Sequence, residues 1–265
     1  MADEANEQLG HENERSSPPP PQQQVTIRII EHIKANKIDV AMWATRMLAI
    51  IFTAGYVLPI FGTSQSSFNK VLLANAATNA LRLHQRLPRF TLSKEFLARL
   101  FTEDSCHYLM FSLIFFNVQP TLFILVPIFL FAVLHAASYS LKIVDLIGQN
   151  SWWGARFLIS LVEFQATNIL KAVAFSEIFI MPMAILLTFM GRAGLMTPFV
   201  YYHFLQMRYN SRRNPYTRNA FAELRMAVES LAGLSPPFVG KVLRAGITFV
   251  NRLSPQPQPT PPPSQ

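Results

Sequence analysis

The sequence predicts an all-α, multi-span α-helical membrane protein with helical hairpins and a C-terminal amphipathic helix. Hydrophobic residues make up 51% of the 265 residues and charged residues only 14%, whereas soluble proteins carry about 25% charged residues. The apolar residues are concentrated in three long runs, at about 40–61, 105–139 and 172–207. Because about 20 apolar residues suffice for a helix to cross a bilayer, each run predicts a membrane segment.

The two ends of the chain are predicted to be disordered tails. Residues 1–24 are acidic and then rich in proline and glutamine, and half of residues 254–265 are proline. Such segments have too little apolar surface to offset the entropy cost of ordering. Residues 1–24 also lack the basic and apolar regions of a signal peptide. The integral membrane core is therefore expected to extend over 25–253.

The first apolar run, at 40–61, reads as a single membrane anchor. Its 22 residues would extend about 33 Å as a helix, which is enough for a hydrocarbon core of about 30 Å. Arg46 lies close enough to the start to extend its guanidinium toward the lipid headgroups. Trp43 and Tyr56 lie near the two ends, where aromatic rings favour the membrane interface.

The second run, at 105–139, is too long for one upright crossing. It has 35 residues without Asp, Glu, Lys or Arg, which corresponds to about 52 Å of helix. Asn117 to Pro120 lie near its middle, and proline removes a backbone donor and breaks a helix. We therefore expect a helical hairpin of two short helices, with both ends on the same side of the membrane.

The third region, at 172–207, contains a membrane core over Ile178–Met190, a turn at Gly191–Gly194 and an aromatic segment after it. That last segment could return into the bilayer or lie along its surface. Glu177 stands inside the apolar region, where a carboxylate can mark a transport pathway. It could also reach the interface or pair with Lys171.

Basic residues predict the orientation of the chain. The loop at 62–104 carries six Lys and Arg and the segment 192–265 carries nine, and positive charge collects on the cytoplasmic side of a membrane. We therefore expect a cytosolic 62–104 loop and a cytosolic C-terminus. Residues 1–39, with seven acids against four bases, would face the lumen. The side of 140–171 depends on whether the chain crosses once or three times.

Within the basic loop, a helix over about 68–87 carries a polar stripe. Asn75, Asn79, Arg82 and Arg86 are spaced so that they share one helix face. The stripe could be a cytosolic partner surface or the face of a helix that lies on the membrane.

Two cationic segments near the C-terminus are predicted to contact anionic lipid headgroups. The first follows the last apolar run directly, as juxtamembrane headgroup-binding clusters do, and this neighbouring bilayer disfavours a nucleic-acid site. Its arginines are Arg208, Arg212, Arg213 and Arg218.

The second cationic segment, 236–253, is predicted to be an amphipathic helix that lies in the membrane interface. Val242, Leu243 and Val250 share one apolar face, and no acidic residue interrupts the opposite face. Such a helix is typical of interfacial membrane segments, although packing on the rest of the protein is the alternative. The basic residues of its polar face are Lys241, Arg244 and Arg252.

The sequence contains no pattern typical of an enzyme. The six histidines are scattered without the spacing of a metal site, and glycine-rich phosphate loops and nucleophile elbows are absent. Cys106 and His107 are adjacent on a helix and project in different directions, so they do not form a nucleophile–base pair. We predict no catalytic residues, no metal and no cofactor.

Several segments between about 36 and 253 resemble, in the same order along the chain, the transmembrane protein 33 family, also called the Krüppel homologue 2 family. They are Asp39–Trp43, Ala80–Pro88, Glu103–Tyr108, Leu134–Tyr139, Glu177–Pro182 and Arg208–Tyr216. The resemblance implies an integral protein of the endoplasmic reticulum and nuclear envelope. It further implies reticulon-type partners, a role in tubular reticulum shape, and a role in nuclear pore assembly or distribution. It brings no catalytic residues.

The leading hypothesis is thus a non-enzymatic membrane protein that organises membrane curvature. The hairpin at 105–139 and the helix at 236–253 would both occupy the cytosolic leaflet more than the luminal one. The competing hypothesis is an ion or small-solute channel or carrier that uses Glu177.

Overall fold

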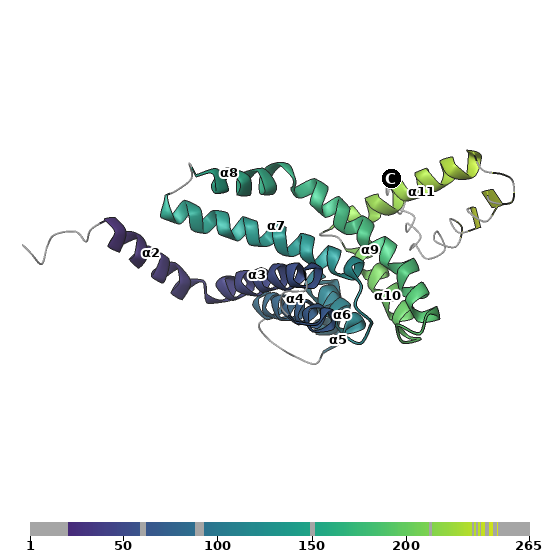
Figure 1. Cartoon of the computed structure of the whole chain (residues 1–265), viewed down its shortest axis with the longest axis horizontal. Coiled ribbons are helices and arrows are strands. Elements are labelled where there is room, and N and C mark those ends of the chain that lie inside the picture. Colours follow the sequence, from purple (N-terminus) through teal and green to yellow (C-terminus); the bar gives the residue numbers. More distant parts are fainter. Residues whose placement is uncertain are drawn as a thin grey trace, which may run out of the picture.

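The computed structural model describes residues 21–58, 62–87, 93–148, 152–211 and 214–234, and a few positions between 236 and 248. Every regular element in these ranges is a helix (Figure 1), which confirms the all-α prediction. In chain order the elements are α2 (Pro21–Ala35), α3 (Lys37–Val57), α4 (Ser64–Arg86), α5 (Lys94–Thr102), α6 (Asp104–Phe115), α7 (Leu122–Ile147), α8 (Trp153–Ile159), a π-helical turn (Ser160–Phe164), α9 (Ala166–Phe189), α10 (Thr197–Asn210) and α11 (Tyr216–Leu234).

Three of these helices, α3, α7 and α9, are long and apolar enough to cross a membrane. They contain the cores of the three apolar runs, so the prediction of a multi-span protein is confirmed. α7 packs against α3 on one side and against α9 on the other. It therefore joins the first half of the molecule to the second (Figure 1).

The helix α4 belongs to the core of the molecule. It begins at the cap residue Thr63, whose side chain accepts a hydrogen bond from the Ser66 N–H, and it packs against α3 and α6. Phe68, Val71 and Leu72 are fully buried in these contacts. The helix predicted over about 68–87 is therefore confirmed as α4, and its apolar face is buried within the protein.

The predicted turn in the second apolar run is confirmed, and the helices beside it are unequal. α6 ends at Phe115 and α7 begins at Leu122. α7 has 26 residues and continues to Ile147, where Gly148 ends it with a positive φ of 76°. The expectation of two short helices is thus corrected: α6 has 12 residues, whereas α7 alone is long enough to span. α6 packs against α4 and α10.

The turn predicted near residue 191 is also confirmed, and α10 folds back against α9 and α6. The Gln119 N–H donates to the Arg192 carbonyl at 3.0 Å, so the turn before α7 is bonded to the turn before α10. α6 and α10 therefore run antiparallel and side by side. Aromatic rings fill their contact, with Phe111 and Phe204 centroids 5.3 Å apart.

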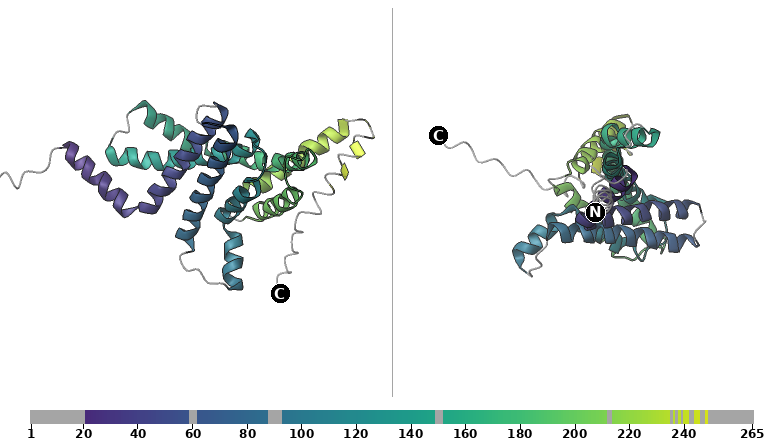
Figure 2. Two further views of the ribbon diagram at one scale, coloured as in Figure 1. Left: turned by 60° about the horizontal axis from the view of Figure 1, so that its bottom comes forward. Right: turned by 90° about the vertical axis from the view of Figure 1, so that its left-hand side faces the viewer.

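Four helices, α2, α5, α8 and α11, lie where the sequence predicted none. α11 packs against α9, with Ala220 buried beside Ala174 and Ile178. α2 begins at Pro21, so residues 21–24 are helical and the predicted tail is shorter than 1–24. Residues 1–20 and 254–265 lie outside the described residues, as does most of 236–253. α5 projects from the body in both views of Figure 2.

Candidate functional site

A buried ion pair connects the middle of α9 to the end of α10. Glu177 is 0% exposed and Arg208 is 1% exposed. The Arg208 Nε–H donates to both carboxylate oxygens of Glu177, at 3.0 and 3.2 Å. Each charge is thus neutralised by a partner from another helix.

Three hydroxyl groups complete the environment of Glu177. The Tyr108 hydroxyl from α6 and the Thr217 hydroxyl from α11 donate to its carboxylate. The Tyr201 hydroxyl from α10 donates to its backbone carbonyl at 2.7 Å. Four helices therefore meet at this one residue, and we call Glu177, Arg208 and these three residues the Glu177 cluster.

Asp104 extends the Glu177 cluster toward the start of α6. Its Oδ1 accepts hydrogen bonds from Arg208 Nη1 at 3.2 Å and from Ser211 Oγ at 2.8 Å. Arg208 thus bridges two carboxylates, and its guanidinium carbon lies 5.3 Å from the centroid of the Tyr108 ring.

The charges of the Glu177 cluster keep its groups in defined protonation states. Burial alone would lower the pKa of Arg208, but the combined effect of Glu177, Tyr108 and Asp104 outweighs it, and this pKa is raised above its ordinary value. Burial, aided by the negative charge of Glu177, raises the pKa of Tyr108 and of Tyr201 well above the usual range for tyrosine. Both phenols therefore remain hydrogen-bond donors.

The prediction that Arg208 belongs to an exposed juxtamembrane cluster is wrong. Its side chain is buried because Glu177 and Asp104 hold it inside the protein. Lys171, the partner considered for Glu177, instead lies 3.7 Å from Glu223. The one residue in the sequence that indicated a buried basic partner was Glu177, because a carboxylate in an apolar run requires such a partner.

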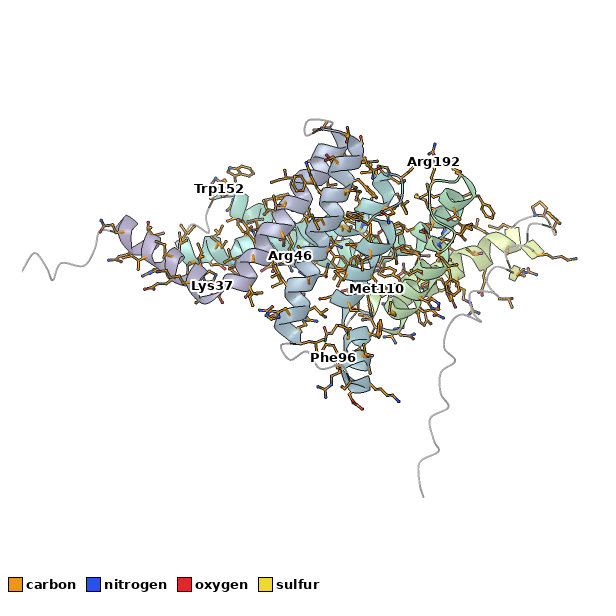
Figure 3. All side chains as sticks on the ribbon, turned by 90° about the horizontal axis from the view of Figure 1, so that it is seen from below. Lys37, Arg46, Phe96, Met110, Trp152 and Arg192 are labelled. Atoms are coloured by element: carbon orange, nitrogen blue, oxygen red, sulfur yellow. The ribbon has the colours of Figure 1, made fainter. Side chains whose placement is uncertain are left out.

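A cavity of about 300 Å³ lies beside the Glu177 cluster, between α3, α4, α6, α7, α9, α10 and the start of α11. Four arginines line it, namely Arg46, Arg82, Arg86 and Arg208. Figure 3 shows that Arg46 lies near the centre of the molecule, with Phe96 at the lower edge and Arg192 at the upper edge. We call this space the arginine cavity.

The polar stripe predicted on α4 lines the arginine cavity. The Asn75 side chain donates to the Tyr108 carbonyl at 3.2 Å and to Ser112 Oγ at 2.8 Å, and Asn79 donates to the Asn75 carbonyl. Arg86 donates to Glu103 at 2.6 Å. The interpretation of the stripe as an exposed partner surface is wrong for Asn75, which is buried because α4 packs against α6.

The remaining predicted headgroup contacts fall on exposed or undescribed residues. Arg218 in α11, Lys241 and Arg244 are exposed. Arg212, Arg213, Val242, Leu243, Val250 and Arg252 lie outside the described residues. Their contact with lipid stays a prediction.

Among the described residues, no group of three histidine, cysteine, aspartate or glutamate side chains is placed to hold a metal ion. The His107 Nε2 lies 2.7 Å from the Phe101 carbonyl, and burial lowers the pKa of His107. The neutral ring therefore connects the end of α5 to α6.

Comparisons with known proteins agree over nearly the whole chain. A family model described as Transmembrane protein 33/Nucleoporin POM33 matches residues 20–256. Krueppel homolog 2 of Drosophila melanogaster is 67% identical over 237 residues, which cover 89% of this chain and 86% of that protein. Transmembrane protein 33 of Homo sapiens is 44% identical over 230 residues, covering 85% and 93% respectively. No solved structure matches.

Proposed function

Because the chain belongs to the Transmembrane protein 33/Nucleoporin POM33 family, we propose that it is a non-enzymatic, multi-pass protein of the endoplasmic reticulum and nuclear envelope. In this proposal it helps to organise tubular reticulum shape together with reticulon-type proteins, and nuclear pore assembly or distribution. The C-terminus faces the cytosol, and the lipid bilayer with its anionic headgroups is the main partner. The family match across 20–256 is the observation that carries the proposal.

Unequal helix lengths support a role in membrane shape. α6 and α10 have 12 and 14 residues, or about 18 and 21 Å at 1.5 Å per residue, and a hydrocarbon core is about 30 Å thick. They are packed side by side, so this pair occupies less depth than α3, α7 and α9. A pair of helices confined mainly to one leaflet widens that leaflet and favours curvature.

Exposed apolar side chains outside the three long helices support the same role. α5 exposes Leu97 and Phe101, and Phe238 is 77% exposed near the start of the predicted C-terminal amphipathic helix. Short segments with one apolar face lie in the membrane interface. Their insertion into the cytosolic leaflet adds to the effect of α6 and α10.

The environment of Glu177 disfavours the channel or carrier hypothesis. Its carboxylate is fully buried and accepts hydrogen bonds from Tyr108, Arg208 and Thr217. A carboxylate that relays ions must exchange its partners during transport, whereas this one holds four helices together.

Reconstitution of the full chain into liposomes tests the proposal. We expect the wild-type protein to convert large anionic vesicles into tubules, as seen by electron microscopy. Val250→Asp adds a charge to the predicted apolar face of the C-terminal helix and should reduce tubule formation at least threefold. Thr248→Asp adds the same charge to the opposite face and is the matched control.

Three results would contradict the proposal. They are vesicles that stay spherical with the wild-type protein, an equal effect of the two aspartate variants, and an ion flux through these vesicles that Glu177→Gln abolishes.

A further inference from the structure

The arginine cavity holds two arginines without a carboxylate partner. Among the described residues, no carboxylate lies within ion-pair distance of Arg46 or Arg82. Asp104 also lines the cavity, but it is bound to Arg208. The charge of Arg82 repels that of Arg46, and Asp39 attracts Arg46 only at longer range. Arg46 is only 8% exposed. A buried charge is costly unless it is paired, so this side of the cavity favours the entry of an anion.

A third arginine offers a donor to the same cavity. Arg208 lines it, is 1% exposed and uses Nε and Nη1 to bind Glu177 and Asp104. Its Nη2 is buried and has no hydrogen-bond partner among the described residues. Unsatisfied buried donors are rare in proteins, so Arg208 keeps one donor for a ligand beside it.

The remaining walls of the arginine cavity are apolar on one side. Ala49 of α3 and Ile128, Phe131 and Ala132 of α7 line it, and both helices are long enough to span a membrane. The cavity thus offers guanidinium groups at one wall and methyl and ring carbons at another.

We propose that the arginine cavity binds a phosphate group, held by Arg46, Arg82 and Arg208. Guanidinium groups present paired N–H donors that match the oxygens of a phosphate. The group could be carried by an anionic phospholipid or be a free phosphate ion, and the apolar wall favours the lipid, whose first methylene groups would contact Ile128 and Phe131. The site is independent of the proposed role in membrane shape.

Lipid binding by the purified full chain in neutral detergent tests this proposal. The probes are phosphatidic acid, phosphatidylcholine and inorganic phosphate, and the readout is native mass spectrometry. We expect phosphatidic acid to bind the wild-type protein at least tenfold more tightly than phosphatidylcholine. Arg82→Gln should weaken phosphatidic acid binding at least tenfold.

The exposed Arg156 of α8 provides the matched control, because it does not line the cavity. Arg156→Gln should change the affinity less than twofold. An equal loss in the two variants, or unchanged binding in Arg82→Gln, would overturn the proposal.

The experiment with inorganic phosphate shows whether the bound phosphate group belongs to a lipid or is a free ion. Competition of millimolar phosphate with phosphatidic acid would assign the site to a soluble phosphate. Binding of phosphatidic acid without such competition assigns it to a lipid. Absence of binding to both would overturn the proposal.

A second pair of variants keeps the test decisive if Arg82→Gln fails to fold. Arg46→Gln removes the facing charge, and phosphatidic acid should then no longer raise the thermal unfolding midpoint as it does for the wild type. Arg82→Lys keeps the charge but loses the paired donors, so it should bind with intermediate affinity. An undiminished stabilisation of Arg46→Gln by the lipid would contradict the site.

Discussion

The Glu177 cluster and the arginine cavity both bury arginines, but they satisfy them differently. Arg208 is bound by Glu177 and by Asp104 at 3.0 to 3.2 Å. Arg46 and Arg82, which line the neighbouring cavity, have no carboxylate within ion-pair distance among the described residues. One region is neutralised by the protein itself, and the other carries excess positive charge.

This difference separates a structural role from a binding role. A buried ion pair holds its helices in one arrangement, and breaking it is costly because it leaves a buried charge without a partner. Arginines that repel each other contribute no such stability, so their presence in a cavity is better explained by a ligand. Stability therefore depends mainly on Glu177 and Asp104 and binding mainly on Arg46 and Arg82, whereas Arg208 belongs to both regions.

The largest expected effect is on the Glu177 cluster. Glu177→Gln keeps the shape of the side chain but leaves Arg208 with an uncompensated buried charge on that side. We expect the free energy of unfolding to fall by about 3–5 kcal/mol, measured by thermal or denaturant unfolding in detergent. A loss below about 1 kcal/mol would show that the cluster does not hold the helices together.

A double substitution sharpens this result. Glu177→Leu with Arg208→Met removes both charges, so neither is left buried without a partner. We expect the double variant to be more stable than either single variant, with a coupling of about 3 kcal/mol in a double-mutant cycle. Additive losses would contradict the ion pair as the cause.

Replacing Arg46 of the arginine cavity should not lower the free energy of unfolding, in contrast to Glu177→Gln. Arg46→Gln removes one of two repelling charges, so in the absence of lipid the free energy of unfolding should stay unchanged or rise by about 1 kcal/mol. The same unfolding experiment measures it. A loss as large as that of Glu177→Gln would indicate that Arg46 is paired within the protein.

The smallest effect is expected at an exposed pair between α9 and α11. Lys171 and Glu223 lie 3.7 Å apart, and each side chain is nearly half exposed. Lys171→Ala should therefore lower the free energy of unfolding by less than about 1 kcal/mol. High salt should remove this difference from the wild type. A larger cost would mean that solvent does not screen this contact.

Much of the fold could be predicted because a helix that crosses a bilayer needs a minimum number of apolar residues. Apolar runs gave the three long helices, and Asn117–Pro120 and Gly191–Gly194 gave the turns, since both signals are local in the sequence. α11 was missed because Arg218, Glu223, Arg225 and Glu229 interrupt its apolar residues, so it contains no long apolar run, and because its burial depends on α9. The pairing of helices across these turns also has no local signal.

The site was harder to predict because its partners are distant in the sequence. Arg208 follows an apolar run directly, as headgroup-binding arginines do, but Glu177 and Asp104 are 31 and 104 residues away. The polar stripe of α4 was found correctly as a common face. Its direction, toward α6 rather than toward solvent, depends on tertiary packing.

The contrast between the two regions is tested most directly by unfolding three proteins side by side, namely the wild type, Glu177→Gln and Arg46→Gln, with and without phosphatidic acid. We expect Glu177→Gln to unfold far more easily under both conditions. Arg46→Gln should match or exceed the wild type without lipid and gain nothing when lipid is added. If both variants lose stability equally and respond equally to the lipid, the two regions do not differ in the way described.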